Sequence, residues 1–206
     1  MKKQKLLLIG SGGHANSCID VIEQEGKFEI AGLVGHPHQV GSRRYGYEVV
    51  GSDTDLESLF VDFKYAIVTI GHVESAESRI RLYNQIKSIG FNIPSIKSKS
   101  AYVSDHAKIG DGTIVMHDAI INSGAIIGSN CIINTRSLIE HDVKVSDHCH
   151  VSTGVVVNGG VQIGSGTFIG SRSVIRDNLS IGDECLVGMG TVLLHDIQNQ
   201  TKIITK

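Results

Sequence analysis

The chain has no tryptophan, only 2 prolines and only 4 cysteines among its 206 residues. The 4 cysteines are Cys18, Cys131, Cys149 and Cys185, and none of them belongs to a CxxC motif. This spacing argues against a disulfide framework and against a zinc knuckle. We therefore expect the four thiols to be reduced and mostly buried.

Long apolar runs and blocks of one charge are absent as well. The apolar run in the N-terminal stretch MKKQKLLLIGSGG is only 4 residues long, which suits a strand better than a signal sequence. No run approaches the length of a transmembrane helix. The formal net charge of −2 includes no basic block, so neither nucleic acid nor an anionic membrane is an expected partner. We expect a cytoplasmic protein that acts on small molecules.

Glycine, in contrast, is plentiful at 24 residues, which indicates many tight turns. The length allows two domains, and the hydrophobic period differs between residues 1–96 and the rest. Expected elements of the first part are strands at residues 5–10, 28–35 and 65–71 and helices at residues 14–26 and 75–90. Gly26 should end the first helix, and Ser75 and Gly90 should cap the second. This order predicts an α/β, Rossmann-like domain with a small parallel sheet.

From Val103 onward, an aliphatic residue recurs at every sixth position. These positions are Val103, Ile109, Val115, Ile121, Ile127, Ile133, Ile139, Val145, Val151, Val157, Ile163, Ile169, Ile175, Ile181, Val187 and Leu193. Four residues after most of them stands a small residue, namely Ala107, Thr113, Ala119, Ala125, Cys131, Ser137, Cys149, Thr167, Ser173, Cys185 or Thr191. A β-solenoid over residues 97–206 explains both rows, because the aliphatic side chain fills the interior and the small one fits the next inward corner.

This pattern resembles the hexapeptide-repeat acyltransferases. The resemblance implies a left-handed parallel β-helix with three hexads per triangular coil, and about five such coils in this chain. The left hand would be an exception to the usual right-handed crossover. The resemblance also implies a homotrimer with sites in the grooves between neighbouring protomers.

His141 is the principal candidate for chemistry, because it stands between Glu140 and Asp142. With three hexads per coil it should lie over Ser123 and under Gly159, and both neighbours are small enough to leave room beside the imidazole. A histidine with a pKa near 6.5 suits general-base catalysis near neutral pH. Either acid could fix its tautomer, and we favour Asp142. The alternative is a histidine that only decorates a corner of the solenoid.

Two stretches sharpen the resemblance: LLIGSGGHANSCID near the N-terminus, and IINTRSLIEHD followed by HVSTGVVVNGGVQIGSGTFIGS. Together they are similar to the family of NeuD-like sialic acid O-acetyltransferases and PglD-like UDP-4-amino-sugar N-acetyltransferases, over nearly the whole chain. The residues that match the N-acetyltransferase branch are His141, Asp142, His150 and Asn134. The O-acetyltransferase branch lacks the acid and the second histidine, so the resemblance favours N-acetylation. It leaves open whether His150 orients His141 across a protomer interface or lies at another corner.

The resemblance further implies acetyl-CoA as co-substrate, with no metal. The coenzyme should lie along the solenoid, where Gly159, Gly170, Gly188 and Gly190 would let its pantetheine approach the backbone. In the implied reaction, the amine of the acceptor attacks the thioester, His141 accepts the proton, and a backbone N–H stabilises the oxyanion. No acyl-enzyme is required.

The sugar nucleotide should bind at the glycine-rich loop of the first domain. The residues implied are Gly10, Ser11, Gly12, Gly13 and His14, which follow a strand and open a helix, where backbone N–H groups can hold a phosphate. Two departures from the family are visible. Val34, Gly35 and His36 stand where relatives usually have LDD, and the chain closes with TKIITK where relatives have a GxPAK-like segment.

Three other functions remain open at this stage. An O-acetyltransferase of sialic or legionaminic acid is the nearest alternative. A γ-type carbonic anhydrase could take its zinc ligands from His117, His141, His148 and His150, since three imidazoles and a water form a catalytic zinc site. If the protein binds no metal, we expect His117 and His148 to lie at the surface. A non-catalytic scaffold would bind the sugar nucleotide without turnover.

Overall fold

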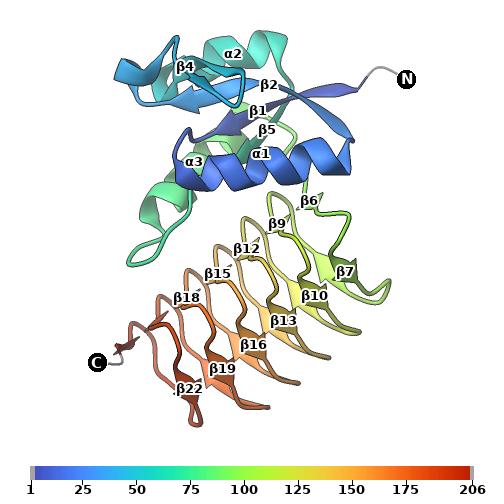
Figure 1. Cartoon of the computed structure of the whole chain (residues 1–206). Coiled ribbons are helices and arrows are strands. Elements are labelled where there is room, and N and C mark those ends of the chain that lie inside the picture. The colour runs from blue at the N-terminus through green and yellow to red at the C-terminus, as the bar shows by residue number, and fades with distance from the viewer. Residues whose placement is uncertain (1–2, 205–206) are drawn as a thin grey trace.

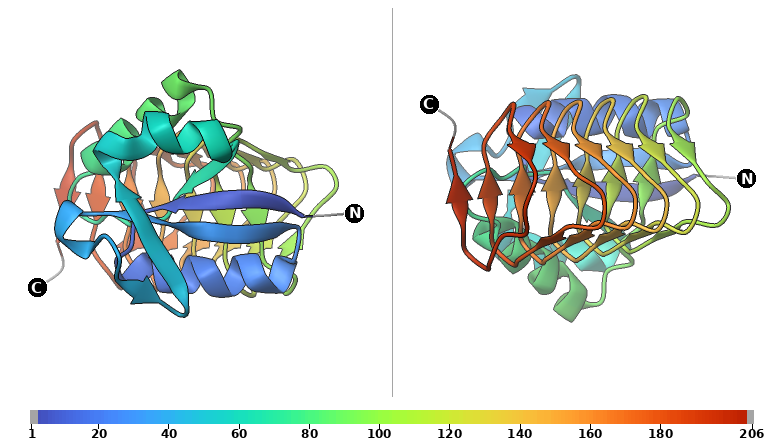
Figure 2. Two further views of the ribbon diagram at one scale, coloured as in Figure 1. Left: turned by 90° about the horizontal axis from the view of Figure 1, so that it is seen from above. Right: turned by 90° about the horizontal axis from the view of Figure 1, so that it is seen from below.

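The computed structural model describes residues 3–204, which form an α/β part followed by a solenoid of short parallel strands (Figure 1). The α/β part lies on one side of the solenoid along much of its length, as the views from above and below also show (Figure 2). The predicted division between residues 96 and 97 falls within β6 (Ile96–Lys97), the first strand of the solenoid.

The α/β part is built on a five-stranded sheet in the order β3-β4-β2-β1-β5. Its elements are β1 (Gln4–Ile9), α1 (Gly13–Glu25), β2 (Phe28–Gly35), a 3-10 helix (Pro37–Gln39), β3 (Arg43–Arg44), β4 (Tyr47–Ser52), a second 3-10 helix (Asp53–Asp55), α2 (Leu56–Asp62), β5 (Tyr65–Val68) and α3 (Glu77–Ile89). Only the β3–β4 pair is antiparallel among these strands. Leu6 and Leu8 of β1 pack on the side of α1, whereas Leu7 and Ile9 pack on the side of α2 and α3.

The three predicted strands and two predicted helices of this part are confirmed, although most of their boundaries are shifted and β5 ends at Val68, before the predicted residue 71. Gly26 ends α1 with a φ of 72°, and Gly90 ends α3 with a φ of 103°. The prediction of Ser75 as the N-cap of α3 is wrong, because the helix begins at Glu77 after Ala76. The Ser75 hydroxyl still accepts a hydrogen bond from the Glu77 N–H, at 3.2 Å. The sequence analysis missed β3, β4 and α2.

The solenoid has three faces, each a parallel sheet. The covered sheet, which the α/β part overlies, contains β6, β9 (Ile114–Val115), β12 (Ile132–Ile133), β15 (His150–Val151), β18 (Phe168–Ile169), β21 (Leu186–Val187) and β23 (Lys202–Ile203). The apolar sheet contains β7 (Tyr102–Val103), β10 (Ile120–Ile121), β13 (Leu138–Ile139), β16 (Val156–Val157), β19 (Val174–Ile175) and β22 (Val192–Leu193). The polar sheet contains β8 (Lys108–Ile109), β11 (Ile126–Ile127), β14 (Lys144–Val145), β17 (Gln162–Ile163) and β20 (Ser180–Ile181).

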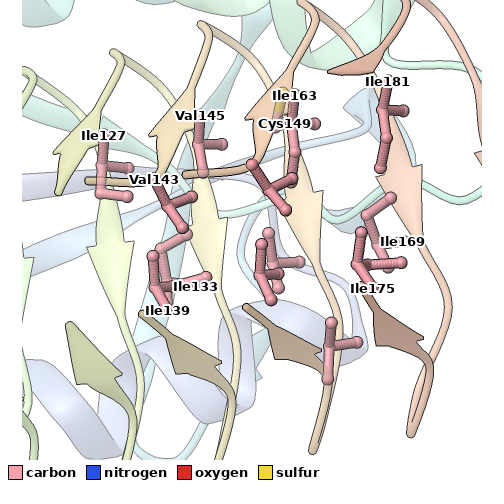
Figure 3. Close-up of a cluster of buried hydrophobic side chains, with 14 of the residues drawn as sticks. Ile127, Ile133, Ile139, Val143, Val145, Cys149, Ile163, Ile169, Ile175 and Ile181 are labelled. Carbon is pink, nitrogen blue, oxygen red and sulfur yellow. The ribbon is translucent and has the colours of Figure 1, made fainter. Parts of the chain in front are cut away.

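The interior of the solenoid confirms the predicted six-residue period. Of the 16 predicted aliphatic positions, 14 lie in one buried interior cluster, and Val103 and Ile109 pack against it. Each is the second residue of a two-residue strand, and Figure 3 shows part of the cluster. Equivalent residues of successive coils pair 18 apart, as Ile121 does with Ile139. The predicted small residues occupy the inward corners, where Thr113 donates to the Gly128 carbonyl at 2.7 Å and Cys149 to the Gly164 carbonyl at 3.0 Å.

The α/β part is attached to the covered sheet by both apolar and polar contacts. Ile19 and Ile22 of α1 share a buried cluster with Ile96 and Ile114 of the solenoid. The guanidinium of Arg79, on α3, is completely buried in the same seam. It donates to the carbonyls of Val68 (3.1 Å) and Ile70 (2.6 Å) in the α/β part, and to the carbonyl of Asn130 (3.1 Å) in the solenoid. One side chain therefore joins both parts of the chain.

Candidate active site

His141 lies at the corner between the apolar and the polar sheets, in the turn that joins β13 to β14. The turn is tight because Asp142 adopts a left-handed backbone with a φ of 60°. The side chain of His141 is 66 % exposed, so its imidazole is open to an approaching substrate.

The two acids beside His141 have different partners. The Nδ1 of His141 lies 3.0 Å from Asp142 Oδ2, and this hydrogen bond is the main cause that raises the pKa of the imidazole above its ordinary value. Glu140 instead accepts from the backbone N–H of His141, at 3.3 Å, and from Asn122 Nδ2, at 3.0 Å. Because the Asp142 carboxylate can only accept at neutral pH, Nδ1 carries the proton and Nε2 is the free acceptor. Asp142, the acid that we favoured, is thus the one that contacts the ring.

The coil stacking places His141 as the 18-residue repeat predicts. The N–H of Asp142 donates to the Ser123 carbonyl below (3.2 Å), and the His141 carbonyl accepts from the Gly160 N–H above (3.0 Å). The imidazole itself lies against Gly159. The register of the coils therefore brings a glycine next to the reactive ring.

A shallow groove of about 490 Å³ opens at this corner. Its lining residues are Glu140, His141, Asp142, Asn158, Gly159, Gly160, Asp177 and Asn178. Three of these residues carry a carboxylate and none is a lysine or an arginine. The groove is therefore a negatively charged surface with a single imidazole in it.

His150 lies on a different face, in β15 of the covered sheet, and it is buried beneath the α/β part. Its Nδ1 donates to the His72 carbonyl at 2.8 Å, and its Nε2 accepts from Asn134 Nδ2 at 3.2 Å. Burial is the first cause that lowers its pKa to about 4. Both ring nitrogens of this neutral histidine are thus engaged within the chain.

The structure brings His14 and His150 together with a third histidine, His72. The ring centroid of His150 is 6.4 Å from that of His14 and 5.5 Å from that of His72. Burial lowers the pKa of both His14 and His72 to about 3. His72 was not among the predicted site residues. It nevertheless follows the end of β5 as His14 follows the end of β1, and the carboxyl ends of parallel strands are where open α/β sheets bind ligands.

The predicted catalytic and sugar-nucleotide residues therefore form two separate groups in one chain. His141 and Asp142, with Gly159, lie at the exposed corner, whereas His14, Asn134 and His150 lie at the seam between the α/β part and the covered sheet.

Comparison with known proteins agrees with this two-part architecture. Residues 5–86 match the PglD N-terminal domain, and residues 106–141 and 160–195 match the bacterial transferase hexapeptide (six repeats). Perosamine N-acetyltransferase from Caulobacter crescentus, solved in complex with CoA and GDP-perosamine, is 28% identical, with a TM-score of 0.91 over 98% of this chain and 93% of that chain. The chain belongs to the NeuD/PglD-like sugar acetyltransferases. Its solenoid is accordingly a left-handed parallel β-helix.

Two further solved structures are similar to this NeuD/PglD-like chain. The acetyltransferase domain of PglB from Neisseria gonorrhoeae FA1090, in complex with acetyl coenzyme A, is 25% identical, with a TM-score of 0.90 over 99% of this chain and 97% of that chain. WeeI from Acinetobacter baumannii AYE is 21% identical, with a TM-score of 0.85 over 98% of this chain and 97% of that chain, and it supports the fold alone.

The glycine-rich loop of this family member is connected by a hydrogen bond to the segment that follows β2. The Ser11 hydroxyl donates to Gln39 Oε1 at 2.9 Å, and the same oxygen accepts from the His36 N–H, also at 2.9 Å. Gly12 precedes α1 without a side-chain cap, and His14 is the second residue of that helix. The backbone N–H groups at this helix start face no capping side chain, which suits an anionic ligand.

The glycines that we expected along the coenzyme path differ in their surroundings. A Cβ at Gly170 would lie 2.5 Å from the Met189 backbone nitrogen, so the stacking of the coils by itself requires glycine there. Gly190 has a φ of 70° and open space where a Cβ would be. Gly188 accepts hydrogen bonds from Ser173 and Thr191 through its carbonyl. These three glycines lie at the corner between the covered and the apolar sheets.

The other two histidines that could have served a metal have structural partners. His117 contacts Asp20 through Nε2 and Ser98 through Nδ1, at 2.7 Å each, and thereby links α1 to the first coils. His148 is half-buried and contacts Asn130 at 3.0 Å, so both of these histidines, which were expected at the surface, are partly exposed and bound to neighbouring side chains. Within residues 3–204, no three His, Cys, Asp or Glu side chains come together as metal ligands would.

Among the helices of residues 3–204, none has the length and apolar character to cross a membrane.

Proposed function

We propose that the protein transfers an acetyl group from acetyl-CoA to the amino group of a nucleotide-linked amino sugar. The observation that carries this proposal is the exposed His141 imidazole, hydrogen-bonded to Asp142 and placed in a groove of carboxylates. The full-length similarity to a perosamine N-acetyltransferase that binds CoA and GDP-perosamine supports the reaction class.

The proposed mechanism uses the two ring nitrogens of His141 for different tasks. Nε2 accepts the proton that the amine loses as it attacks the thioester carbonyl, and Asp142 stabilises the imidazolium through Nδ1. Gly159 contacts the imidazole, and its backbone N–H donates to no group within residues 3–204, so we assign this N–H to the oxyanion. As the C–N bond forms and the C–S bond breaks, the imidazolium returns its proton to the thiolate of CoA.

The charge of the groove supports an amine acceptor over the O-acetylation of a sialic or legionaminic acid. An amino sugar approaches as an ammonium ion near neutral pH, and Glu140, Asp142 and Asp177 would attract it. A sialic acid carries its own carboxylate, which the same side chains would repel. The charge of the groove therefore supports the N-acetylating branch of the family.

The remaining assignments follow the family resemblance. We propose that Gly159, Gly170, Gly188 and Gly190 lie along the acetyl-CoA path, and that the loop from Gly10 to His14, with Asn134 and His150, contributes to the sugar-nucleotide site. We propose uridine diphosphate as the carrier; the GDP-perosamine of the Caulobacter relative makes guanosine diphosphate the alternative. The 4 free, buried cysteines fit a reducing compartment, which supports a cytoplasmic location.

We also propose that the working unit is a homotrimer formed through the apolar sheet. The outward residues of its strands are Tyr102, Ile120, Leu138, Val156, Val174 and Val192. Of these, Tyr102 is 58 %, Ile120 40 % and Val192 64 % exposed in the single chain. A continuous apolar row of this kind is typical of an interface. Because the apolar sheet borders the corner that holds His141, a neighbouring copy packed on this sheet would lie beside the groove.

A charged residue in this row should break the trimer. Val174→Asp would desolvate a carboxylate in the interface, so we expect monomers by size-exclusion chromatography with light scattering, together with loss of turnover. Gln162→Asp, on the exposed face of the polar sheet, is the matched control and should leave the trimer intact. A Val174→Asp protein that remains trimeric would assign the interface to another face.

An acceptor panel tests the proposed reaction directly. Release of CoA thiol from acetyl-CoA is measured with UDP-linked and GDP-linked 4-amino sugars, with sialic and legionaminic acids, and with the CMP forms of these acids. We expect turnover only with amino-sugar nucleotides, and an acetamide product by mass spectrometry. Turnover with an acid would instead assign O-acetylation. Nucleotide-sugar binding without any turnover would favour the scaffold function.

A further inference from the structure

Gly159 is in direct contact with the imidazole of His141. A Cβ at this position would lie 2.6 Å from Nε2, 2.7 Å from Cε1 and 3.3 Å from Cδ2 of His141. These three atoms are also the nearest neighbours that such a Cβ would meet. The edge of the ring that carries Nε2 therefore occupies the space in which any other residue would hold its side chain.

The backbone and the stacking of the coils do not explain glycine at this position. Gly159 does not adopt the left-handed conformation that favours glycine, unlike its neighbour Gly160, with a φ of 70°. The equivalent positions one coil before and one coil after, His141 and Asp177, carry side chains. At Gly110, Gly128 and Gly164, which lie one residue earlier in the turn and at a different corner of the coil, a Cβ would meet the main chain of the next coil at 2.7 Å or less. At Gly159 it would meet only the His141 side chain among its three nearest atoms. Glycine at 159 is thus explained by the histidine.

The other member of the pair, Asp142, lies over a glycine as well. A Cβ at Gly124, 18 residues earlier, would clash with the Asp142 carboxylate oxygen Oδ1. Gly124 also has a left-handed φ of 76°, so its identity has two causes that substitution cannot separate. Gly159 has no left-handed φ, so it offers the cleaner test.

We propose that Gly159 is a positioning residue for His141, in addition to its assigned place on the coenzyme path. The missing side chain lets the imidazole lie against the next coil with Nδ1 on Asp142 and with Nε2 free of any hydrogen bond within residues 3–204. This inference rests on the proposed function only for its effect on rate. The placement of the ring is a property of the chain itself.

Gly159→Ala tests the inference, and it separates positioning from a role in coenzyme binding. The methyl group should push the ring away from Asp142, so the pKa of His141 should fall back towards 6.5. This pKa is measured by NMR titration of the imidazole, assigned with His141→Ala, and it needs no turnover. In steady-state kinetics kcat should fall about 100-fold, as expected for a misplaced catalytic group, with KM for acetyl-CoA unchanged.

A double-variant cycle provides the control. In the His141→Ala background the ring is gone, so Gly159→Ala should have no further effect on activity or on melting temperature. The inference is overturned if Gly159→Ala leaves the His141 pKa in place and raises KM for acetyl-CoA, or if it destabilises both backgrounds equally. If the pKa falls but no acceptor is ever acetylated, the positioning stands and the proposed reaction fails.

Discussion

Replacing His141 with alanine should lower kcat by about 10³-fold, the range in which a positioned general base contributes. The imidazole is the only nitrogen base among the side chains that line the groove, so it is the group that would take the proton that the attacking amine loses. KM for acetyl-CoA should change little, since the alanine removes no predicted coenzyme contact. The measurement is CoA thiol release under saturating acceptor.

His106→Ala is the matched control for this variant. His106 is also an exposed histidine at a corner of the solenoid, and its side chain has no hydrogen-bond partner within residues 3–204. We expect activity equal to that of the unmodified protein. If His141→Ala retains more than about a tenth of the rate, catalysis rests on positioning and on the oxyanion donor alone.

The pH dependence of the same rate follows from the raised pKa of His141. The base must be neutral to accept a proton, so the rate should rise with pH and level off above a pKa that is higher than 6.5. Asp142→Asn removes the carboxylate that favours the charged ring. The rise should therefore move to lower pH, and the plateau should fall because the imidazolium loses its partner.

Replacing Arg79 with methionine should lower the free energy of unfolding by about 3–5 kcal/mol, the cost typical of breaking a buried charged network. The guanidinium is fully buried, and burial lowers its pKa to about 10. Methionine fills much of the same volume but leaves the carbonyls of Val68, Ile70 and Asn130 without this donor. Urea unfolding monitored by circular dichroism gives the change.

The control for Arg79 is on the same helix. Arg81 lies on the exposed side of α3 and pairs with Asp53 at 2.9 Å, with both side chains in contact with solvent. Arg81→Met should change the stability by less than about 1 kcal/mol. Equal unfolding midpoints for Arg79→Met and the unmodified protein would mean that the seam is held by its apolar contacts alone.

The solenoid was predictable because its contacts repeat. A residue at one position determines what its neighbours 18 residues away can be, so the pattern of Val145, Ile163 and Ile181 already describes one inner edge. β4 and α2 follow no such period. β4 pairs with β2 through a hairpin and a 3-10 helix, without a crossover helix, and α2 has only 7 residues, too few for a clear helical pattern.

The candidate site was predictable only in part. His141 and Asp142 are adjacent in sequence, so their contact required only that the turn direct both side chains outward. The partners of His150 lie 78 and 16 residues away, at His72 and Asn134, and no local pattern indicates the first of them. His72 could not be predicted for the same reason. It is buried in the folded chain next to His150 of β15, which lies 78 residues away in the sequence.

The sequence by itself determined the parallel coils, their inward rows and the corner at which His141 stands, because a six-residue period in aliphatic residues has one way to bury them. Only the tertiary structure decided which of the two acids holds the imidazole, which histidines become neutral at the seam, and why residue 159 has no side chain. These properties depend on which face the α/β part covers and on how one coil rests on the next. Such contacts arise between residues that share no local pattern, so they exist only once the chain is folded.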